Sequence, residues 1–66
     1  MTYKEIRCTV DAESPKAYLL NISGEIHWFP KSKIELTKTG SAIIPEWLID
    51  EKQIIIHESD LIRVWE

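Results

Sequence analysis

Turn-forming residues interrupt this chain at short intervals, and this spacing limits the fold more than any other feature of the sequence. Pro15, Ser23-Gly24, Pro30 and Lys38-Thr39-Gly40 each break an apolar pattern, because proline cannot donate to a strand ladder and glycine tolerates positive φ. Turn signals at a spacing of about 8–12 residues are typical of an all-β domain. We therefore predict a mostly β fold, either a small five- to six-stranded barrel or a strongly bent antiparallel sheet.

The predicted strands are the alternating apolar and polar segments between these turns. They cover residues 3–10, 16–22, 25–29, 33–37, 53–57 and 61–65, with a loop at 11–15 and a polar turn at 58–60. In the strand 25–29, Ile26 and Trp28 share one face, and His27 and Phe29 share the other. Because Ile26 is apolar, this parity favours a Trp28 that fills the core and leaves Phe29 exposed.

One short helix is predicted at about residues 45–52. Pro45 suits the first helical position, and the acidic side chain of Glu46 is favourable at the positive end of the helix dipole. The segment is about two turns long and has no glycine at its C-terminal end.

The composition predicts one soluble domain over residues 1–66. The hydrophobic fraction of 44% and the charged fraction of 29% are near the average for globular domains. No apolar run approaches the roughly 20 residues that span a bilayer, and the first residues have no hydrophobic leader segment. We therefore expect the protein to stay in the cytoplasm. Cys8, the only cysteine, lies in the alternating run Ile6, Cys8, Val10 and is predicted to be a core residue.

No combination of side chains predicts catalysis. His27 and His57 lack the Cys/His spacing that holds zinc, and Asp50 and Glu51 are adjacent on the predicted helix, so their carboxylates diverge. Two isolated glycines make no Gly-rich phosphate loop. A core this small also cannot enclose a deep pocket. We expect a non-enzymatic protein with no metal and no cofactor.

The candidate binding residues are aromatic and basic. Aromatic side chains that stack on bases and lysines that neutralise phosphates are the components of single-strand nucleic-acid binding, although core packing and a solvated turn explain the same residues. Trp65 is a further candidate, because exposed tryptophan is enriched at interaction hot spots. The candidate partner-binding residues are Tyr18, Trp28, Phe29, Lys31, Lys33 and Trp65.

The net charge of −3 is unevenly distributed along the chain. Residues 41–66 hold two basic and six acidic side chains, whereas residues 1–40 hold six basic and five acidic ones. A nucleic-acid-binding domain is usually basic with a clustered patch. The overall charge therefore favours a protein partner over nucleic acid.

Two segments form an ordered pair of motifs: Gly24-Glu25-Ile26-His27-Trp28-Phe29-Pro30-Lys31-Ser32-Lys33-Ile34, and Ile44-Pro45-Glu46-Trp47-Leu48 followed by Glu51-Lys52. Together they resemble short uncharacterised proteins encoded by bacteriophages and prophages, in which a Gly-Glu turn precedes Trp-Ile-Pro-Lys-Ser and then Ile-Pro-Glu-Trp-Leu. The similarity covers roughly residues 16–54. Phe29 stands where that pattern has an aliphatic residue, and Gln53 where it has glycine. The Phe29-Pro30 pair is also similar to the strand end of a Src-homology-3-type barrel.

The resemblance implies an origin in a phage or another mobile element, and hence the cytoplasm of a bacterial host. Our main hypothesis is a small module that binds a protein partner stoichiometrically, a host nucleic-acid-processing or defence protein that it inhibits being one such partner. The alternative is a single-stranded nucleic-acid-binding accessory protein. A third hypothesis is a homo-oligomer that associates through a strand edge or Trp65.

Overall fold

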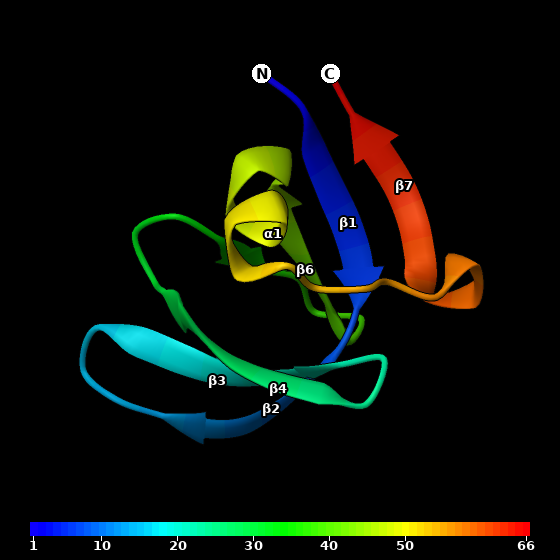
Figure 1. Cartoon of the computed structure of the whole chain (residues 1–66). Helices are drawn as coiled ribbons and strands as arrows, with labels where there is room; N and C mark the ends of the chain where they lie inside the picture. Colours follow the sequence, from blue (N-terminus) through cyan, green and yellow to red (C-terminus); the bar gives the residue numbers. More distant parts are fainter.

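The computed structural model describes residues 1–66 and contains seven strands, one α-helix and one 3₁₀ helix (Figure 1). In chain order these are β1 (Tyr3–Arg7), β2 (Thr9–Glu13), β3 (Ala17–Ile22), β4 (Glu25–Pro30), β5 (Glu35–Leu36), β6 (Ser41–Pro45), α1 (Glu46–Lys52), η1 (Glu58–Asp60) and β7 (Leu61–Trp65). The strands form two antiparallel sheets with the orders β5-β6-β1-β7 and β2-β3-β4. The predicted mostly β fold with one short helix is confirmed, with seven strands in place of five or six.

A break at Cys8 lets one stretch of chain contribute to both sheets. β1 pairs with β6 and β7, whereas β2, which starts one residue after Cys8, pairs with β3. The Cys8 N–H donates to the Gly40 carbonyl at 3.1 Å, which holds the chain where it leaves the first sheet. The strand predicted at 3–10 is therefore two strands. Residues 11–13, predicted as a loop, belong to β2, which carries a register shift between Val10 and Ala12.

β6 is the one strand that the sequence pattern does not predict, and it is the most buried. Four of its five residues are buried: Ser41, Ala42, Ile44 and Pro45. It pairs with β1 over its full length, from Tyr3 opposite Pro45 to Arg7 opposite Ser41. A strand that is covered on both faces shows no apolar–polar alternation, so this short run has no pattern that identifies it.

The strand predicted at residues 53–57 is wrong, because this segment belongs to neither sheet. The Ile54 N–H donates back to the Ile49 carbonyl at 3.2 Å, and the Ile55 N–H donates to the Glu25 carboxylate at 3.2 Å. Ile54 is buried and Ile56 packs against the core, so the apolar run reflects burial of single side chains and not a strand ladder. The strand predicted at 33–37 shortens to β5, and the turn predicted at 58–60 is the 3₁₀ helix η1.

α1 begins at Glu46 and ends at Lys52, one residue shorter than predicted, because Pro45 is the last residue of β6. Gln53 follows the helix in the left-handed conformation, with φ 55° and ψ 42°, and its N–H donates to the Asp50 carbonyl at 3.1 Å. Glycine adopts this conformation at low cost, whereas a residue with a Cβ is strained there. The absence of a glycine at the helix end therefore costs stability.

Gln53→Gly is expected to stabilise the protein by about 0.5–1 kcal/mol. Relief of about 1–2 kcal/mol of left-handed strain exceeds the extra unfolded-state entropy of glycine, which is about 0.5–1 kcal/mol. In a domain of this size the melting temperature rises by roughly 2–8 °C, which thermal denaturation followed by circular dichroism measures. Gln53→Ala is the matched control, because it keeps the strain and does not raise the melting temperature. A glycine variant that melts below the wild type would contradict this assignment.

Hydrogen bonds join the β3–β4 hairpin turn to the segment before β7. Ser23 and Gly24 both have positive φ, 51° and 86°, as a tight two-residue turn requires. The Ser23 hydroxyl donates to the Asp60 carboxylate at 2.7 Å and accepts from the His57 N–H at 3.1 Å. Ser23 thus ties the turn of one sheet to the 3₁₀ helix that leads into the other.

Ser23→Ala is expected to destabilise the protein by about 1–2 kcal/mol, because it leaves the Asp60 carboxylate and the His57 N–H without this partner. Urea denaturation measures the loss, and hydrogen exchange at the His57 amide should become faster. Ser59→Ala is the control, since Ser59 lies in the same 3₁₀ helix, is exposed and makes no side-chain hydrogen bond. Equal stability of the two variants would show that the Ser23 hydrogen bonds do not contribute to the free energy of unfolding.

The core lies between the two sheets and against α1 (Figure 1). Its largest fully buried apolar side chains are Phe29, Ile6, Leu20, Ile22 and Ile44. The prediction that Cys8 is a core residue is confirmed, because its exposed fraction is 8%. No helix of the protein has the length and apolar character that a membrane crossing needs.

Candidate functional site

The structure reverses the predicted orientation of Trp28 and Phe29. Phe29 is fully buried, with an exposed fraction of 0%, whereas Trp28 is 46% exposed. The Ser23-Gly24 turn fixes the register of the hairpin, so Phe29 lies opposite Tyr18, and Trp28 lies opposite Leu19 on the other face. The prediction that Trp28 fills the core and that Phe29 is exposed is wrong. Phe29 supports the surface from beneath and cannot itself contact a partner.

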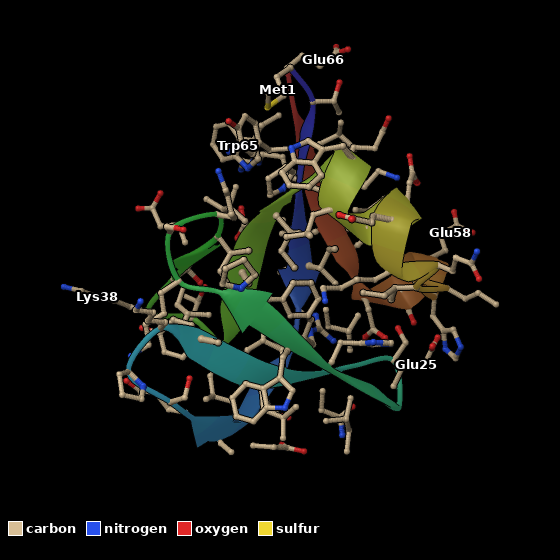
Figure 2. All side chains as sticks on the ribbon, turned by 60° about the vertical axis from the view of Figure 1, so that its left-hand side comes forward. Met1, Glu25, Lys38, Glu58, Trp65 and Glu66 are labelled. Atoms are coloured by element: carbon tan, nitrogen blue, oxygen red, sulfur yellow. The ribbon has the colours of Figure 1, made fainter.

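The outward face of the β2-β3-β4 sheet is apolar and uncovered. Trp28 and Ile26 are its most exposed large residues, at 46% and 52%, and in both views the rest of the chain lies on the other side of this sheet (Figures 1 and 2). The registers of the two strand pairs place on this face Thr9, Ala12, Ala17, Leu19, Asn21, Ile26, Trp28 and Pro30. A charge borders these side chains at β2, where the Asp11 carboxylate accepts a hydrogen bond from the Thr9 hydroxyl at 3.3 Å. We call this surface the Trp28 face.

The basic candidate residues lie at one end of the Trp28 face and not within it. An open cavity of about 360 Å³ is found there, lined by Pro15, Lys16, Pro30, Lys31 and Ser32. The Lys31 ammonium is ion-paired with Glu13 and lies 4.8 Å from the centroid of the partly buried Tyr18 ring. Lys33 is exposed and makes no ion pair. Of the two predicted lysines, only Lys33 has a charge that no carboxylate offsets.

Trp65 belongs to the other sheet. It lies on β7 opposite Tyr3 of β1, is 40% exposed, and has the Arg63 guanidinium 4.8 Å from its ring centroid. Figure 2 shows Trp65 near Met1, at the end of the molecule where both termini lie. The structure therefore does not bring Trp65 together with Trp28, and the two are separate surfaces.

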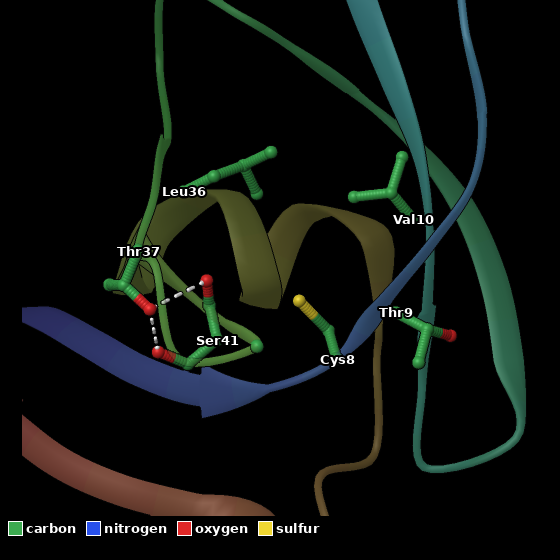
Figure 3. Close-up of a pocket in the computed structure, with 7 residues that line it drawn as sticks. Cys8, Thr9, Val10, Leu36, Thr37 and Ser41 are labelled. Atoms are coloured by element: carbon green, nitrogen blue, oxygen red, sulfur yellow. Dashed lines mark hydrogen bonds between the residues drawn. The ribbon is translucent and has the colours of Figure 1, made fainter.

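An open cavity of about 260 Å³ lies where the two sheets separate (Figure 3). Its lining residues are Cys8, Thr9, Val10, Leu36, Thr37, Gly40 and Ser41. Its hydroxyl groups have partners within the protein: Thr37 Oγ1 and Ser41 Oγ are 2.6 Å apart, the Ser41 hydroxyl donates to the Glu5 carboxylate at 2.9 Å, and the Thr9 hydroxyl donates to the Asp11 carboxylate at 3.3 Å. A ligand in this cavity would therefore contact mainly the apolar side chains of Val10 and Leu36.

The Cys8 thiol in this cavity has no activating neighbour. No histidine, lysine or arginine lines the cavity, and burial raises the pKa of the Cys8 thiol. A reactive cysteine needs the opposite, a thiolate stabilised by positive charge. No group of three or more His, Cys, Asp or Glu side chains that could hold a metal ion is present either.

Native Cys8 is expected to react with iodoacetamide at pH 8 much more slowly than the same protein in urea, because burial keeps the thiol protonated and covered. The raised pKa also has a consequence for stability. The unfolded thiol loses its proton first as pH rises past about 8.5, so the stability that the protonated thiol gives below that pH is lost at higher pH. Equal alkylation rates with and without urea would contradict a buried thiol.

Leu19 and Ile26 are the residues of the Trp28 face that the sequence pattern misses. A usable signal exists in the hairpin itself. A two-residue turn at Ser23-Gly24 places Asn21 opposite Ile26, and a polar asparagine on that face marks it as the outward one.

Compared with protein-family models, with curated proteins and with solved structures, the chain shows no significant match. The function must therefore be inferred from the residues of the chain itself.

Proposed function

We propose that this protein is a non-catalytic module that binds one protein partner, one to one, through the Trp28 face. The observation that supports this proposal is an uncovered sheet face on which the most exposed large residues, Trp28 and Ile26, are aromatic and aliphatic, with the charge of Asp11 at its β2 margin. Contiguous exposed apolar patches on small proteins mark interaction sites. Burial of such a surface contributes about 25 cal/mol per Å² of apolar area to the free energy of binding. A partner with its own apolar patch would therefore bind this face favourably.

Local structure supports a rigid presentation of this face. Phe29 packs directly beneath it in the core, and Ser23 ties the hairpin turn to η1. We further propose that the two sheets, joined through β1 and β2, act together as a small barrel-like scaffold. A rigid surface loses little conformational entropy on binding, so more of the apolar burial appears as affinity.

The biological context that we propose rests on the resemblance of the two sequence motifs to phage and prophage proteins. In that setting the partner is a protein of the bacterial host, in the cytoplasm, and binding inhibits a nucleic-acid-processing or defence protein. The six acidic side chains of residues 41–66 lie outside the Trp28 face. Partner contact in this proposal therefore depends on apolar packing and not on mimicry of DNA charge.

Single-stranded nucleic-acid binding, the alternative, has less support. Binding sites of this kind combine exposed aromatic side chains with free cations along a groove, but Phe29 is buried and Lys31 is ion-paired with Glu13. The proposal predicts no micromolar binding of labelled single-stranded oligonucleotides at low salt in fluorescence anisotropy. Binding that falls steeply with salt and is lost in Lys31→Glu and Lys33→Glu would replace the proposal with this alternative.

Capture with matched baits tests the proposal. Wild type, Trp28→Ser and Trp47→Ser are immobilised and exposed to a lysate of the cells in which the protein is made. Trp47 is a suitable control, because it is 44% exposed on α1, outside the Trp28 face. A single partner that is retained by wild type and Trp47→Ser, lost by Trp28→Ser and bound one to one in native mass spectrometry is the expected result. No retained partner, or equal retention by all three baits, would contradict the proposal.

A further inference from the structure

β7 is an edge strand with little protection. It pairs with β1 alone, and residues 62–66 make no further backbone hydrogen bond outside that pair. Ile62, Val64 and Trp65 are each at least 40% exposed, and Arg63 is the only charged residue in the strand. An edge of this kind leaves backbone N–H and C=O groups free to pair with another strand.

The other three sheet edges carry features that prevent such pairing. β5 has only two residues, β2 is interrupted by a register shift at Asp11 and ends at Glu13, and β4 ends at Pro30. Short strands, irregularities, charges and proline are the usual means of protecting an edge. β7 has a register shift near its start, but Arg63, Val64 and Trp65 pair regularly with β1.

We propose that β7 pairs antiparallel with β7 of a second copy of this chain, around a two-fold axis at Val64. The two four-stranded sheets then continue edge to edge, and the interface is isologous, as it is in most protein dimers. This surface lies apart from the Trp28 face, so the inference does not depend on the proposed function.

The side chains beside β7 favour this register and a second copy as the partner. Within one chain, Trp65 lies opposite Tyr3, and Arg63 lies opposite Glu5. An axis at Val64 places Arg63 opposite Trp65 of the second copy. On one face of the joined sheet, four side chains then follow one another across the strands: Tyr3 and Trp65 of one copy, then Arg63 and Glu5 of the second copy. Arginine thus lies between an aromatic ring and a carboxylate, both of which attract it.

The symmetric register with its axis one residue earlier is unfavourable. An axis at Arg63 would place the two guanidinium groups directly opposite each other, and like charges in that position destabilise a strand pair. An unrelated strand would not supply the matching arginine and tryptophan at the required spacing. The contact already seen within one chain, Arg63 at 4.8 Å from the Trp65 ring, shows that this pair is compatible with the sheet surface.

Sedimentation equilibrium over a concentration series tests the association. Because the interface is small, we expect a dissociation constant on the order of 100 μM, with the mass rising from 7.7 kDa towards twice that value. Arg63→Gln should remain monomeric at concentrations where the wild type dimerises, with an unchanged circular dichroism spectrum, since it removes the cation that faces Trp65 of the second copy and places no like charge opposite Glu5 of its own chain. Arg7→Glu is the control, because Arg7 is exposed at the far end of β1 and should still dimerise. Trp28→Ser should also dimerise, which separates this test from that of the proposed function.

Cysteine crosslinking tests the register. Only a residue on the axis meets its own copy, with Cβ atoms about 4.5–5.5 Å apart, close to the range a disulfide needs. Val64→Cys should therefore form a disulfide-linked dimer under mild oxidation, whereas Ile62→Cys and Arg63→Cys alone should not. A mixture of Arg63→Cys and Trp65→Cys chains should form the mixed dimer. A monomer up to about 1 mM, a concentration that would detect even weak association, or equal crosslinking at all positions, would overturn the proposal.

Discussion

Phe29→Ala is expected to unfold most of the protein at 25 °C. Phe29 is fully buried and is the largest of the fully buried side chains, and truncation of such a phenylalanine costs about 3–5 kcal/mol. A chain of 66 residues has a total stability of only about 3–10 kcal/mol. The loss is therefore comparable to the whole free energy of unfolding, and circular dichroism with urea denaturation measures it directly.

The neighbouring residue provides the matched control. Trp28→Ala removes a larger side chain, but one that is 46% exposed, and we expect it to cost about 1 kcal/mol or less. Phe29→Leu keeps an apolar side chain in the core and should cost less than about 1.5 kcal/mol. If Trp28→Ala proved more destabilising than Phe29→Ala, the assignment of inward and outward faces to β4 would be wrong.

Trp28→Ala is expected to weaken binding of the protein partner by about 2 kcal/mol or more, which is roughly a 30-fold rise in Kd. The truncation removes the largest exposed apolar side chain of this face. Ile26, two residues away on the same face, is expected to contribute less because its side chain is smaller. Isothermal titration calorimetry with the captured partner measures both effects.

Trp47→Ala is the control for this effect, since Trp47 is exposed to nearly the same extent, 44%, on α1. Binding by the Trp47 variant should match that of the wild type within a factor of about two, which corresponds to the small effects of most peripheral contacts. A Trp47 variant that binds as poorly as the Trp28 variant would indicate either a different binding surface or a general loss of structure.

The local signals in the sequence predict much of this fold. The Ser23-Gly24 turn, the short helix after Pro45 and the buried Cys8 depend on residues within a few positions of each other, and such signals can be seen in a single sequence. Gln53, where a glycine was expected, takes the left-handed conformation itself. The helix thus ends where the pattern indicated, although the residue there is poorly suited to it.

The errors arise where the answer depends on distant parts of the chain. Ile26 and Trp28 could be recognised as sharing a face, but which face packs inward depends on what covers the sheet. The sequence pattern does not predict β6, because residues on both of its faces are buried, which removes the alternation. The run Ile54–Ile56 resembles a strand in sequence, but the N–H groups of Ile54 and Ile55 donate to the Ile49 carbonyl and to the Glu25 carboxylate.

The candidate site could be predicted only in part for the same reason. The candidates Trp28, Lys33 and Trp65 are exposed, although strand parity favours a buried Trp28. Phe29 is core, and Lys31 lies over the Tyr18 ring and is ion-paired with Glu13. Leu19 and Ile26 join the site only through the register of the hairpin. An apolar surface residue and an apolar core residue look alike in sequence, and only the packing of the sheet separates them.

Site-specific photo-crosslinking tests the central claim, that the Trp28 face contacts a protein partner, most directly. Benzoylphenylalanine replaces Trp28 in one protein and Trp47 in another, and each is irradiated in the lysate of the producing cells. We expect one adduct whose mass is the sum of this chain and one partner, formed from position 28 and absent from position 47. An adduct that forms from position 47 but not from position 28, or no adduct from position 28, would contradict the claim.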